Sequence, residues 1–285
     1  MKHITRVTKG PEPHWVGDGF HVRSVITPRG GKALGPFVLM DYAGPEEFGP
    51  SSEPRGVDTH PHKGFETVTV VFQGELEHRD SAGNSGKIGP GDVQWMTAAS
   101  GILHEEKHSQ SFTEQGGVLE MAQIWVNLPA KHKEASPRYQ TLLAQDIPVI
   151  ELPDSLGSVK VIAGDFDGTP GAAETFTPVT IWAISIQSAG RFTLPIPEGH
   201  PGGVYVRQGS VMIGEEMIHQ AEFAEFAEEG AGLHVEAPAG AELLVLAGEP
   251  INEPMVAYGP FVMNSMDEIQ QAMMEFRAGK YGTLV

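Results

Sequence analysis

The sequence predicts an all-β protein built from two antiparallel β-barrels. Short runs rich in Val, Ile, Thr and Phe alternate along the chain with 35 glycines and 22 prolines, a pattern typical of sandwiches and barrels. The 285 residues exceed the usual length of one domain. A strand that ends in Gln-Gly occurs twice, in 70–74 and in 204–209, which suggests a duplicated barrel. We expect one barrel in residues 1–130, a linker in 131–148 and a second barrel in 149–285.

The strands are predicted from period-2 alternation or from short, fully apolar runs. The candidates are Phe65–Phe72, Gly91–Trp95, Leu119–Asn127, Val159–Ala163, Thr180–Gln187, Gly203–Arg207 and Ala241–Ala247.

Two segments have helical character. In residues 135–144 the pattern is weak. Near the C-terminus, Ser265 and Glu268 form a capping-box pattern, and Gly279 stands where a helix commonly ends. Apolar residues recur between them at helical spacing, namely Ile269, Ala272, Met273 and Phe276. We expect this short helix to belong to the C-terminal domain and to pack against a barrel.

Composition excludes several classes of function. The 19 basic and 37 acidic residues give a net charge of -18, which opposes direct binding to nucleic acid. The chain has no cysteine, so any metal must be held by nitrogen and oxygen. Neither a secretory signal nor a stretch long enough to span a bilayer is found. We therefore expect a cytoplasmic protein with no nucleic-acid or membrane partner.

Two pairs of candidate metal ligands carry the chemistry. His60 and His62 flank Pro61, which keeps the preceding residue extended. Alternate residues of a strand point to the same side, so both imidazoles would face one way, and the same spacing relates His104 to Glu106. Three imidazoles and one carboxylate suit Fe(II), Mn(II), Ni(II), Cu(II) or Zn(II), with positions left for water, substrate or dioxygen.

The surrounding motifs resemble a known family. Gly56, His60, His62, Glu66 and Gly74 approximate the first cupin motif, and Pro-Gly-Asp at 90–92 followed by a histidine resembles a lengthened second motif. More specifically, HPHKGFETVT (60–69), GDVQWMTAASGILHEE (91–106), QIWVNLP (123–129) and YGPFVMNSMDEIQQA (258–272) are similar to signature stretches of pirins. These stretches span most of the chain.

The resemblance implies a bicupin that binds one divalent transition metal, in its N-terminal barrel only. The pirin ligands match His60, His62, His104 and Glu106. In ordinary cupins the motif-one glutamate, here Glu66, is commonly a ligand. Glu66 shares the parity of His62 and remains the alternative to the favoured Glu106. Fe(II) is the expected ion, with Mn, Ni, Cu and Zn as alternatives.

Other histidines are interpreted as non-ligands. His200 and His234 have no matching partner pair in the second barrel. His78 is predicted to be a packed or hydrogen-bonded residue rather than a fifth ligand. We expect a monomer, because two fused barrels can cover in one chain the surface that single-barrel cupins cover by dimerising.

The resemblance also implies a function. Pirins are similar to flavonol dioxygenases, in which the 3-hydroxyl of a flavonol such as quercetin would coordinate the metal and lose its proton. The ring would then react with dioxygen, open and release carbon monoxide, with Glu106 as ligand and base. An alternative is a metal-containing, redox-responsive regulator that binds a protein partner, such as a transcriptional cofactor or a regulator of a metabolic enzyme. A metal-binding cupin without catalysis is a third possibility, against which the intact ligand set argues.

Overall fold

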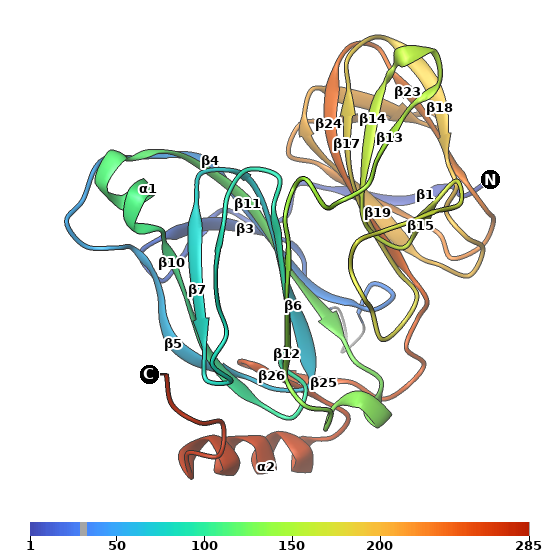
Figure 1. Cartoon of the computed structure of the whole chain (residues 1–285). Coiled ribbons are helices and arrows are strands. Elements are labelled where there is room, and N and C mark those ends of the chain that lie inside the picture. Colours follow the sequence, from blue (N-terminus) through green and yellow to red (C-terminus); the bar gives the residue numbers. More distant parts are fainter. Residues whose placement is uncertain (29–32, 285) are drawn as a thin grey trace. The chain divides into compact units, whose positions relative to one another are not determined.

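The computed structural model describes residues 1–28 and 33–284. Contacts divide the chain into two compact units. The larger unit comprises Pro11–Ala33, Phe37–Ala144 and Ile251–Val285, and the smaller unit comprises Met1–Gly10, Leu34–Pro36 and Gln145–Pro250. Both consist mainly of strands (Figure 1), and every strand pairing between the described strands is antiparallel.

The larger unit contains two sheets of unequal size. In its described part the large sheet has the order β12-β9-β6-β11-β4-β3-β2 and the small sheet the order β5-β10-β7-β8. Their strands are β2 (His14–Val16), β3 (Phe20–Ile26), β4 (Phe37–Phe48), β5 (Gly56–His62), β6 (Phe65–Gln73), β7 (Leu76–Asp80), β8 (Ser85–Ile88), β9 (Val93–Thr97), β10 (Ile102–His108), β11 (Gly117–Asn127) and β12 (Arg138–Leu142). The hairpin β25 (Val256–Tyr258) and β26 (Phe261–Met263) and the helices α1 (Gln110–Gln115), η1 (Ala130–His132) and α2 (Met266–Arg277) complete it.

The smaller unit repeats this plan. Its large sheet has the order β1-β22-β19-β24-β17-β14-β13 and its small sheet the order β18-β23-β20-β21. The elements are β1 (Ile4–Thr8), β13 (Val149–Glu151), η2 (Pro153–Ser155), β14 (Gly157–Ala163), β15 (Asp165–Phe166), β16 (Thr169–Pro170), β17 (Val179–Ile186), β18 (Gly190–Leu194), β19 (Gly202–Gln208), β20 (Ser210–Ile213), β21 (Glu216–His219), β22 (Phe223–Phe226), β23 (Leu233–Ala237) and β24 (Ala241–Gly248).

The predicted duplication is visible in the order of the strands. β6 occupies the place in its sheet that β19 occupies in the other, and each lies beside a long partner, β11 or β24. Both strands end at the Gln-Gly pairs noted in the sequence, where Gly74 and Gly209 have φ of 83° and 80°. Glycine adopts this left-handed conformation without a steric penalty. The predicted all-β fold with two barrel-type domains and a short C-terminal helix is confirmed.

The predicted strands are also found, with boundaries shifted by up to two residues. The exception among the local predictions is residues 135–144, where weak helical character was expected. This segment contains strand β12, and its residues Arg138 to Leu142 pair with Thr97 to Val93 of β9. Pairing with β9, which makes β12 the edge strand of the sheet, thus outweighs a weak local preference for helix.

The units differ from the predicted division at both ends of the chain. β1 at the N-terminus hydrogen-bonds to β22 and belongs to the smaller unit, and residues 251–285 belong to the larger unit. Part of the expected linker, in 131–148, is strand β12 of the larger unit. These assignments depend on pairing between residues far apart in sequence, which local patterns do not reveal.

The C-terminal segment packs beside the turn that follows β5. Val262 donates its backbone N–H to the Lys63 carbonyl oxygen at 3.0 Å. Between β5 and β6, Gly64 has a φ of 91°, and a Cβ atom there would lie 2.0 Å from the Val262 carbonyl oxygen. Only glycine therefore allows this close approach of two backbones.

The C-terminal helix has the predicted cap. The Ser265 hydroxyl accepts from the Glu268 backbone N–H, and the Glu268 carboxylate accepts from the Ser265 N–H. Ile269 and Ala272 are buried against Phe261 of β26. The helix lies beside the β25–β26 hairpin (Figure 1). The helix therefore belongs to the larger unit, whereas the sequence-based division assigned it to the C-terminal barrel.

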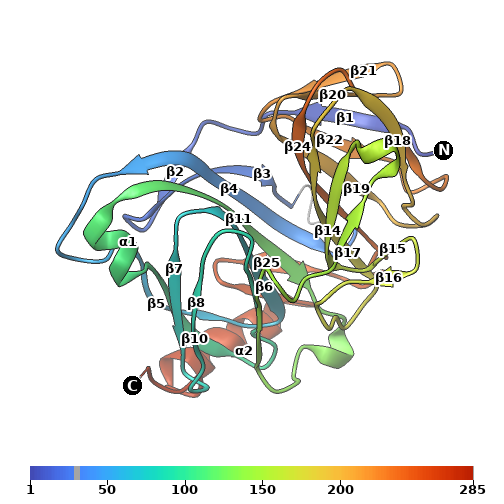
Figure 2. The same cartoon turned by 45° about the horizontal axis from the view of Figure 1, so that its top comes forward.

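The interiors of the two units differ. A continuous apolar cluster, which includes the fully buried Trp182, Val204 and Leu243, fills the smaller unit. In the larger unit, buried polar side chains such as His104, Thr69 and Gln94 lie between the strands. Figure 2 shows the strands of this unit, with β4 and β11 side by side. Buried polar groups are costly without partners, so this interior is the place to seek a functional site.

Candidate metal centre

Strands β5 and β10 bring the two predicted ligand pairs together. The strands are antiparallel neighbours, and His60 lies directly opposite His104. The register shifts between His104 and Glu106, so that Glu106 lies opposite Val57 and an irregularity falls at Asp58 and Thr59 of β5. Such bulges redirect side chains and are common beside functional sites.

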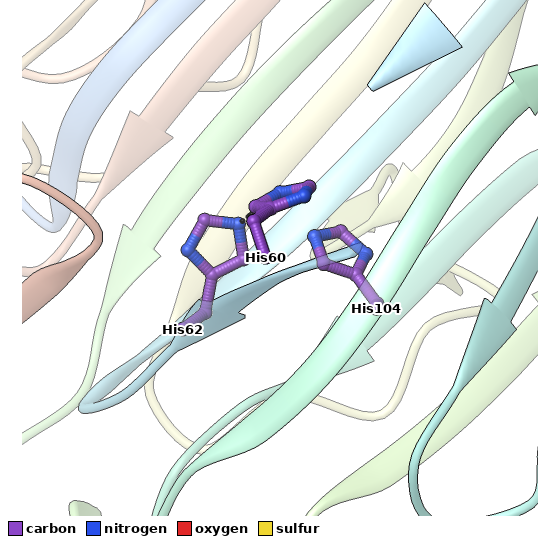
Figure 3. Close-up of side chains that lie close together, drawn as sticks. All are labelled: His60, His62 and His104. Carbon is purple, nitrogen blue, oxygen red and sulfur yellow. Dashed lines mark hydrogen bonds between the residues drawn. The ribbon is translucent and has the colours of Figure 1, made fainter. Parts of the chain in front are cut away.

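The three imidazoles of His60, His62 and His104 converge in one cluster (Figure 3). One ring nitrogen of each lies within 4.8 Å of the other two. The Nε2 atoms of His60 and His62 are 3.1 Å apart. His62 and His104 are buried and His60 is half-buried, so the cluster lies at the inner end of an opening to solvent.

Hydrogen bonds to carbonyl groups fix the tautomers of the first pair. Nδ1 of His60 lies 2.8 Å from the Asp58 carbonyl oxygen, and Nδ1 of His62 lies 3.4 Å from that of Pro260. A carbonyl oxygen can only accept, so each Nδ1 carries the proton and each Nε2 presents a lone pair. Two such lone pairs cannot hydrogen-bond to each other, and their closeness favours an electrophile between them.

A divalent metal ion fits this arrangement. Nitrogen ligands lie about 2.1 Å from such an ion, so two in adjacent positions are about 3 Å apart. Nε2 of His104 is buried, and no hydrogen-bond partner for it is found among the described residues. An unpaired buried acceptor is costly, and a metal ion would satisfy it. His60, His62 and His104 therefore have the donor atoms, tautomers and spacing of metal ligands.

A buried chain of hydrogen bonds orients His104 from behind. Nε2 of His78 lies 3.3 Å from Asp80 Oδ2 and donates to it, since an ionised carboxylate only accepts. Nδ1 of His78 then accepts from Gln94 Nε2 at 3.1 Å and faces Nδ1 of His104 at 3.4 Å. With its Nδ1 proton directed to His78, His104 turns its Nε2 lone pair to the cluster. Metal-bound histidines commonly have such supporting partners.

The electrostatics favour neutral rings. Burial, together with the neighbouring histidines, holds the pKa of His62 and of His104 well below the ordinary value of 6.5. These two imidazoles are thus uncharged at neutral pH, which is the form that binds metal. Burial raises the pKa of Asp80, but hydrogen bonds from His78 and Asn84 outweigh it, and the pKa is lowered overall.

Glu106 lies next to His104 and is held by three polar neighbours. Thr69 Oγ1 and Gln94 Nε2 lie 3.0 and 3.3 Å from its Oε1, and Gln123 Nε2 lies 3.4 Å from its Oε2. The carboxylate is 7% exposed. It forms a second cluster of possible ligand atoms with His78 and His104. The structure thus brings Glu106 together with His104 and His78, whereas His60 and His62 share a cluster with His104 only.

Glu66 points to the opposite face of the sheet. Thr69 contacts Glu106, and Glu66 is an odd number of residues away on the same strand, so their side chains alternate. The Glu66 carboxylate accepts instead from Thr97 Oγ1 at 2.6 Å. Burial raises the pKa of this carboxyl. Glu66 and His62 are an even number of residues apart, but they lie on different strands, because the turn at Lys63 and Gly64 interrupts the alternation. Glu66 belongs to neither cluster of possible ligand atoms.

A cavity of about 330 Å³ opens onto the site. His60, His62 and Glu106 line one part of it. Most of the remaining lining is apolar, with Val16, Phe20, Val22, Val57, Met121, Trp125 and Pro260. Asp41 and Gln123 add polar groups. An apolar space with a few convergent polar groups suits an aromatic ligand.

The sequence indicated the two pairs of candidate ligands but not the side chains that surround them. Thr69, Gln94 and Gln123 come from three different strands of the large sheet, and nothing local in the sequence marks them as neighbours of Glu106. His78 is hydrogen-bonded, and it also joins a cluster of possible ligand atoms. His200 and His234 belong to neither cluster found in the described part of the chain.

Comparisons with known proteins agree with the family and the fold expected from the sequence. The Pirin family model matches residues 19–126, and the Pirin C-terminal cupin domain model matches residues 181–282. A Pseudomonas aeruginosa protein named "Putative quercetin 2,3-dioxygenase" is 49% identical over 99% of both chains. Human pirin is 37% identical over 93% of this chain and 89% of its own.

A solved structure is also similar throughout. The quercetin 2,3-dioxygenase from Acinetobacter baumannii has a TM-score of 0.96 and 44% identity, with 100% of each chain covered. In the described part of the present chain, neither α1 nor α2 is long and apolar enough to cross a membrane.

Proposed function

Because the chain belongs to the pirin family, we propose that it is a metal-dependent dioxygenase that opens the ring of a flavonol such as quercetin. The observation that carries the proposal is the meeting of three imidazoles at the wall of a mostly apolar cavity. The names of the relatives from Pseudomonas aeruginosa and Acinetobacter baumannii support the same activity.

In this proposal His60, His62, His104 and Glu106 hold one divalent ion, and Fe(II) is the expected one. The chemistry that a bound ion would supply is Lewis acidity toward a phenolic oxygen and reactivity toward dioxygen. His78 and the carbonyl of Asp58 hold the rings in the tautomer that binds metal.

The walls of the cavity position the substrate. Phe20, Val22 and Trp125 offer apolar surface to a flat aromatic molecule and keep water away from it. The flavonol 3-hydroxyl would then point to the histidine cluster, where Glu106 is the nearest carboxylate and the proposed acceptor of its proton. Thr69, Gln94 and Gln123 fix the direction of that carboxylate.

Oxygen uptake tests the proposal. Metal-free protein is reconstituted separately with Fe(II), Mn(II), Ni(II) or Cu(II) and given quercetin, with His62→Ala as the site variant. His234→Ala removes an exposed histidine outside both clusters and is the matched control. We expect quercetin-dependent uptake with at least one ion, retained in His234→Ala and lost in His62→Ala.

The same experiment decides between enzyme and regulator. Stoichiometric binding of metal without turnover of quercetin would refute the dioxygenase. It would favour the alternative of a metal-containing regulator whose affinity for a protein partner depends on the oxidation state of the ion.

A further inference from the structure

A row of polar side chains crosses the inner face of the large sheet. The residues lie directly opposite one another on adjacent strands, from β3 through β4, β11 and β6 to β9. In that order they are Ser24, Asp41, Gln123, Thr69 and Gln94. The last three contact Glu106. Asp41 lies beyond them, one strand away from Gln123.

Asp41 is a carboxylate that the metal site does not use. Its Oδ1 accepts from Ser24 Oγ at 2.6 Å. Its other neighbour, Gln123, is occupied by Thr69 Oγ1 at 2.6 Å and by Glu106 at 3.4 Å. The side chain is half-buried, and this burial raises the pKa of Asp41. The side chain lines the cavity together with His60 and Glu106.

The separation between Asp41 and the histidine cluster determines which part of a bound ligand can reach Asp41. Adjacent strands are about 4.8 Å apart, and Gln123, on the adjacent strand, contacts Glu106. A ligand that reaches the histidine cluster with one oxygen therefore reaches Asp41 with a group farther along its rings. The apolar walls between them, including Val22 and Met121, favour an aromatic framework in that span.

The charges of the cavity restrict the ligand further. Asp41 and Glu106 are carboxylates, and none of the described residues that line the cavity is a lysine or an arginine. Carboxylates accept hydrogen bonds and repel anions. The cavity thus suits an aromatic ligand with hydroxyl groups that can donate.

We propose that Asp41 determines substrate specificity by accepting a hydrogen bond from a second hydroxyl group of the aromatic substrate, away from the group that meets the metal. The proposal rests on the proposed function, because it assumes that this cavity binds flavonols. Asp41 would then favour the binding of polyhydroxylated flavonols over flavonols that carry the 3-hydroxyl alone.

Two ligands and three variants test it. Quercetin carries several ring hydroxyls, whereas 3-hydroxyflavone carries only the 3-hydroxyl. Affinities of the metal-loaded protein are measured without oxygen, by quenching of tryptophan fluorescence, so that binding is read without turnover. Asp41→Ala removes the acceptor, Asp41→Asn keeps its size and the contact with Ser24, and Glu47→Ala removes an exposed carboxylate of the same strand.

We expect wild type to bind quercetin more tightly than 3-hydroxyflavone. Asp41→Ala should weaken quercetin binding by about 10- to 100-fold, the loss of one hydrogen bond to a charged group, and leave 3-hydroxyflavone almost unchanged. Glu47→Ala should change neither affinity. If Asp41→Ala does not retain its metal, Asp41→Asn decides, with a smaller loss confined to quercetin.

The proposal is overturned if both Asp41 variants keep the wild-type preference, or weaken the two ligands equally. It is also overturned if wild type prefers neither ligand. An Asp41-dependent preference without oxygen uptake would refute the dioxygenase and retain Asp41 as a binding determinant. Oxygen uptake on quercetin, with an unchanged ligand preference in the Asp41 variants, would support the dioxygenase and refute Asp41 as a specificity determinant.

Discussion

Replacing Lys133 by methionine should remove part of the pH dependence of stability. Lys133 is 2% exposed, and its Nζ donates to the carbonyl oxygens of Gly64 and Val262 and to Asn127 Oδ1, at 2.7, 2.8 and 2.6 Å. It thereby ties the C-terminal hairpin to the turn that follows His62. Burial lowers the pKa of this lysine from 10.5 to about 7.

The sign of the effect follows from the lowered pKa. Between about pH 7 and 10.5 the unfolded chain binds more protons at Lys133 than the folded chain does. The free energy of unfolding therefore rises with pH in this window, and the cost of burying the charge is fully present below it. From pH 7 to pH 9 wild type should gain about 2 kcal/mol relative to Lys133→Met. The absolute offset caused by losing three hydrogen bonds does not affect this slope.

Urea unfolding at several pH values measures the difference. In a Trp182→Phe background, Trp15, Trp95 and Trp125 all lie in the larger unit, so fluorescence reports the unit that contains Lys133. Lys131→Met, which removes an exposed lysine two residues away, is the matched control. Parallel curves for wild type and Lys133→Met would refute the reasoning, because they would show that the three acceptors keep the lysine charged despite its burial.

Three further outcomes are expected. Glu106→Gln should lower metal affinity by about 10-fold or more, whereas Glu66→Gln should leave it unchanged, and competition with a chelator measures both. Equal effects would contradict the conclusion that Glu66 points away from the histidine cluster. His78→Ala should weaken metal binding by about 10- to 100-fold, because His104 loses the side chain that orients it. The ligand-field spectrum of the Cu(II) form should change as well. An unchanged spectrum would indicate general destabilisation instead. Ser265→Ala should destabilise the C-terminal helix by about 1 kcal/mol, measured by urea unfolding, and no change would show that the capping box is dispensable.

Short-range patterns predicted much of the fold and the shared side of the two histidines on β5. His60 and His62 share a side because strand geometry alternates, and that rule needs no tertiary information. The same holds for the cap at Ser265, which involves residues three apart. Both features are local, and both are found in the structure.

Local patterns mislead where a turn or a distant pairing intervenes. Glu106 is the favoured carboxylate, and the alternative, Glu66, depends on an alternation that runs across Gly64, whose φ of 91° marks the turn between two strands. The helix after Ser265 was placed with the wrong barrel because the contact between Val262 and Lys63 joins residues about 200 positions apart. The environment of Glu106 depends in the same way on three strands of one sheet, and only the fold brings them together.

The central claim is that one metal ion is held by the cluster that contains His104, and metal stoichiometry tests it most directly. Metal-free wild type, His104→Ala and His234→Ala are incubated with Fe(II) without oxygen, desalted and analysed for metal, with circular dichroism to verify folding. We expect one ion per chain in wild type and His234→Ala, and almost none in folded His104→Ala. A full complement of iron in His104→Ala would contradict it.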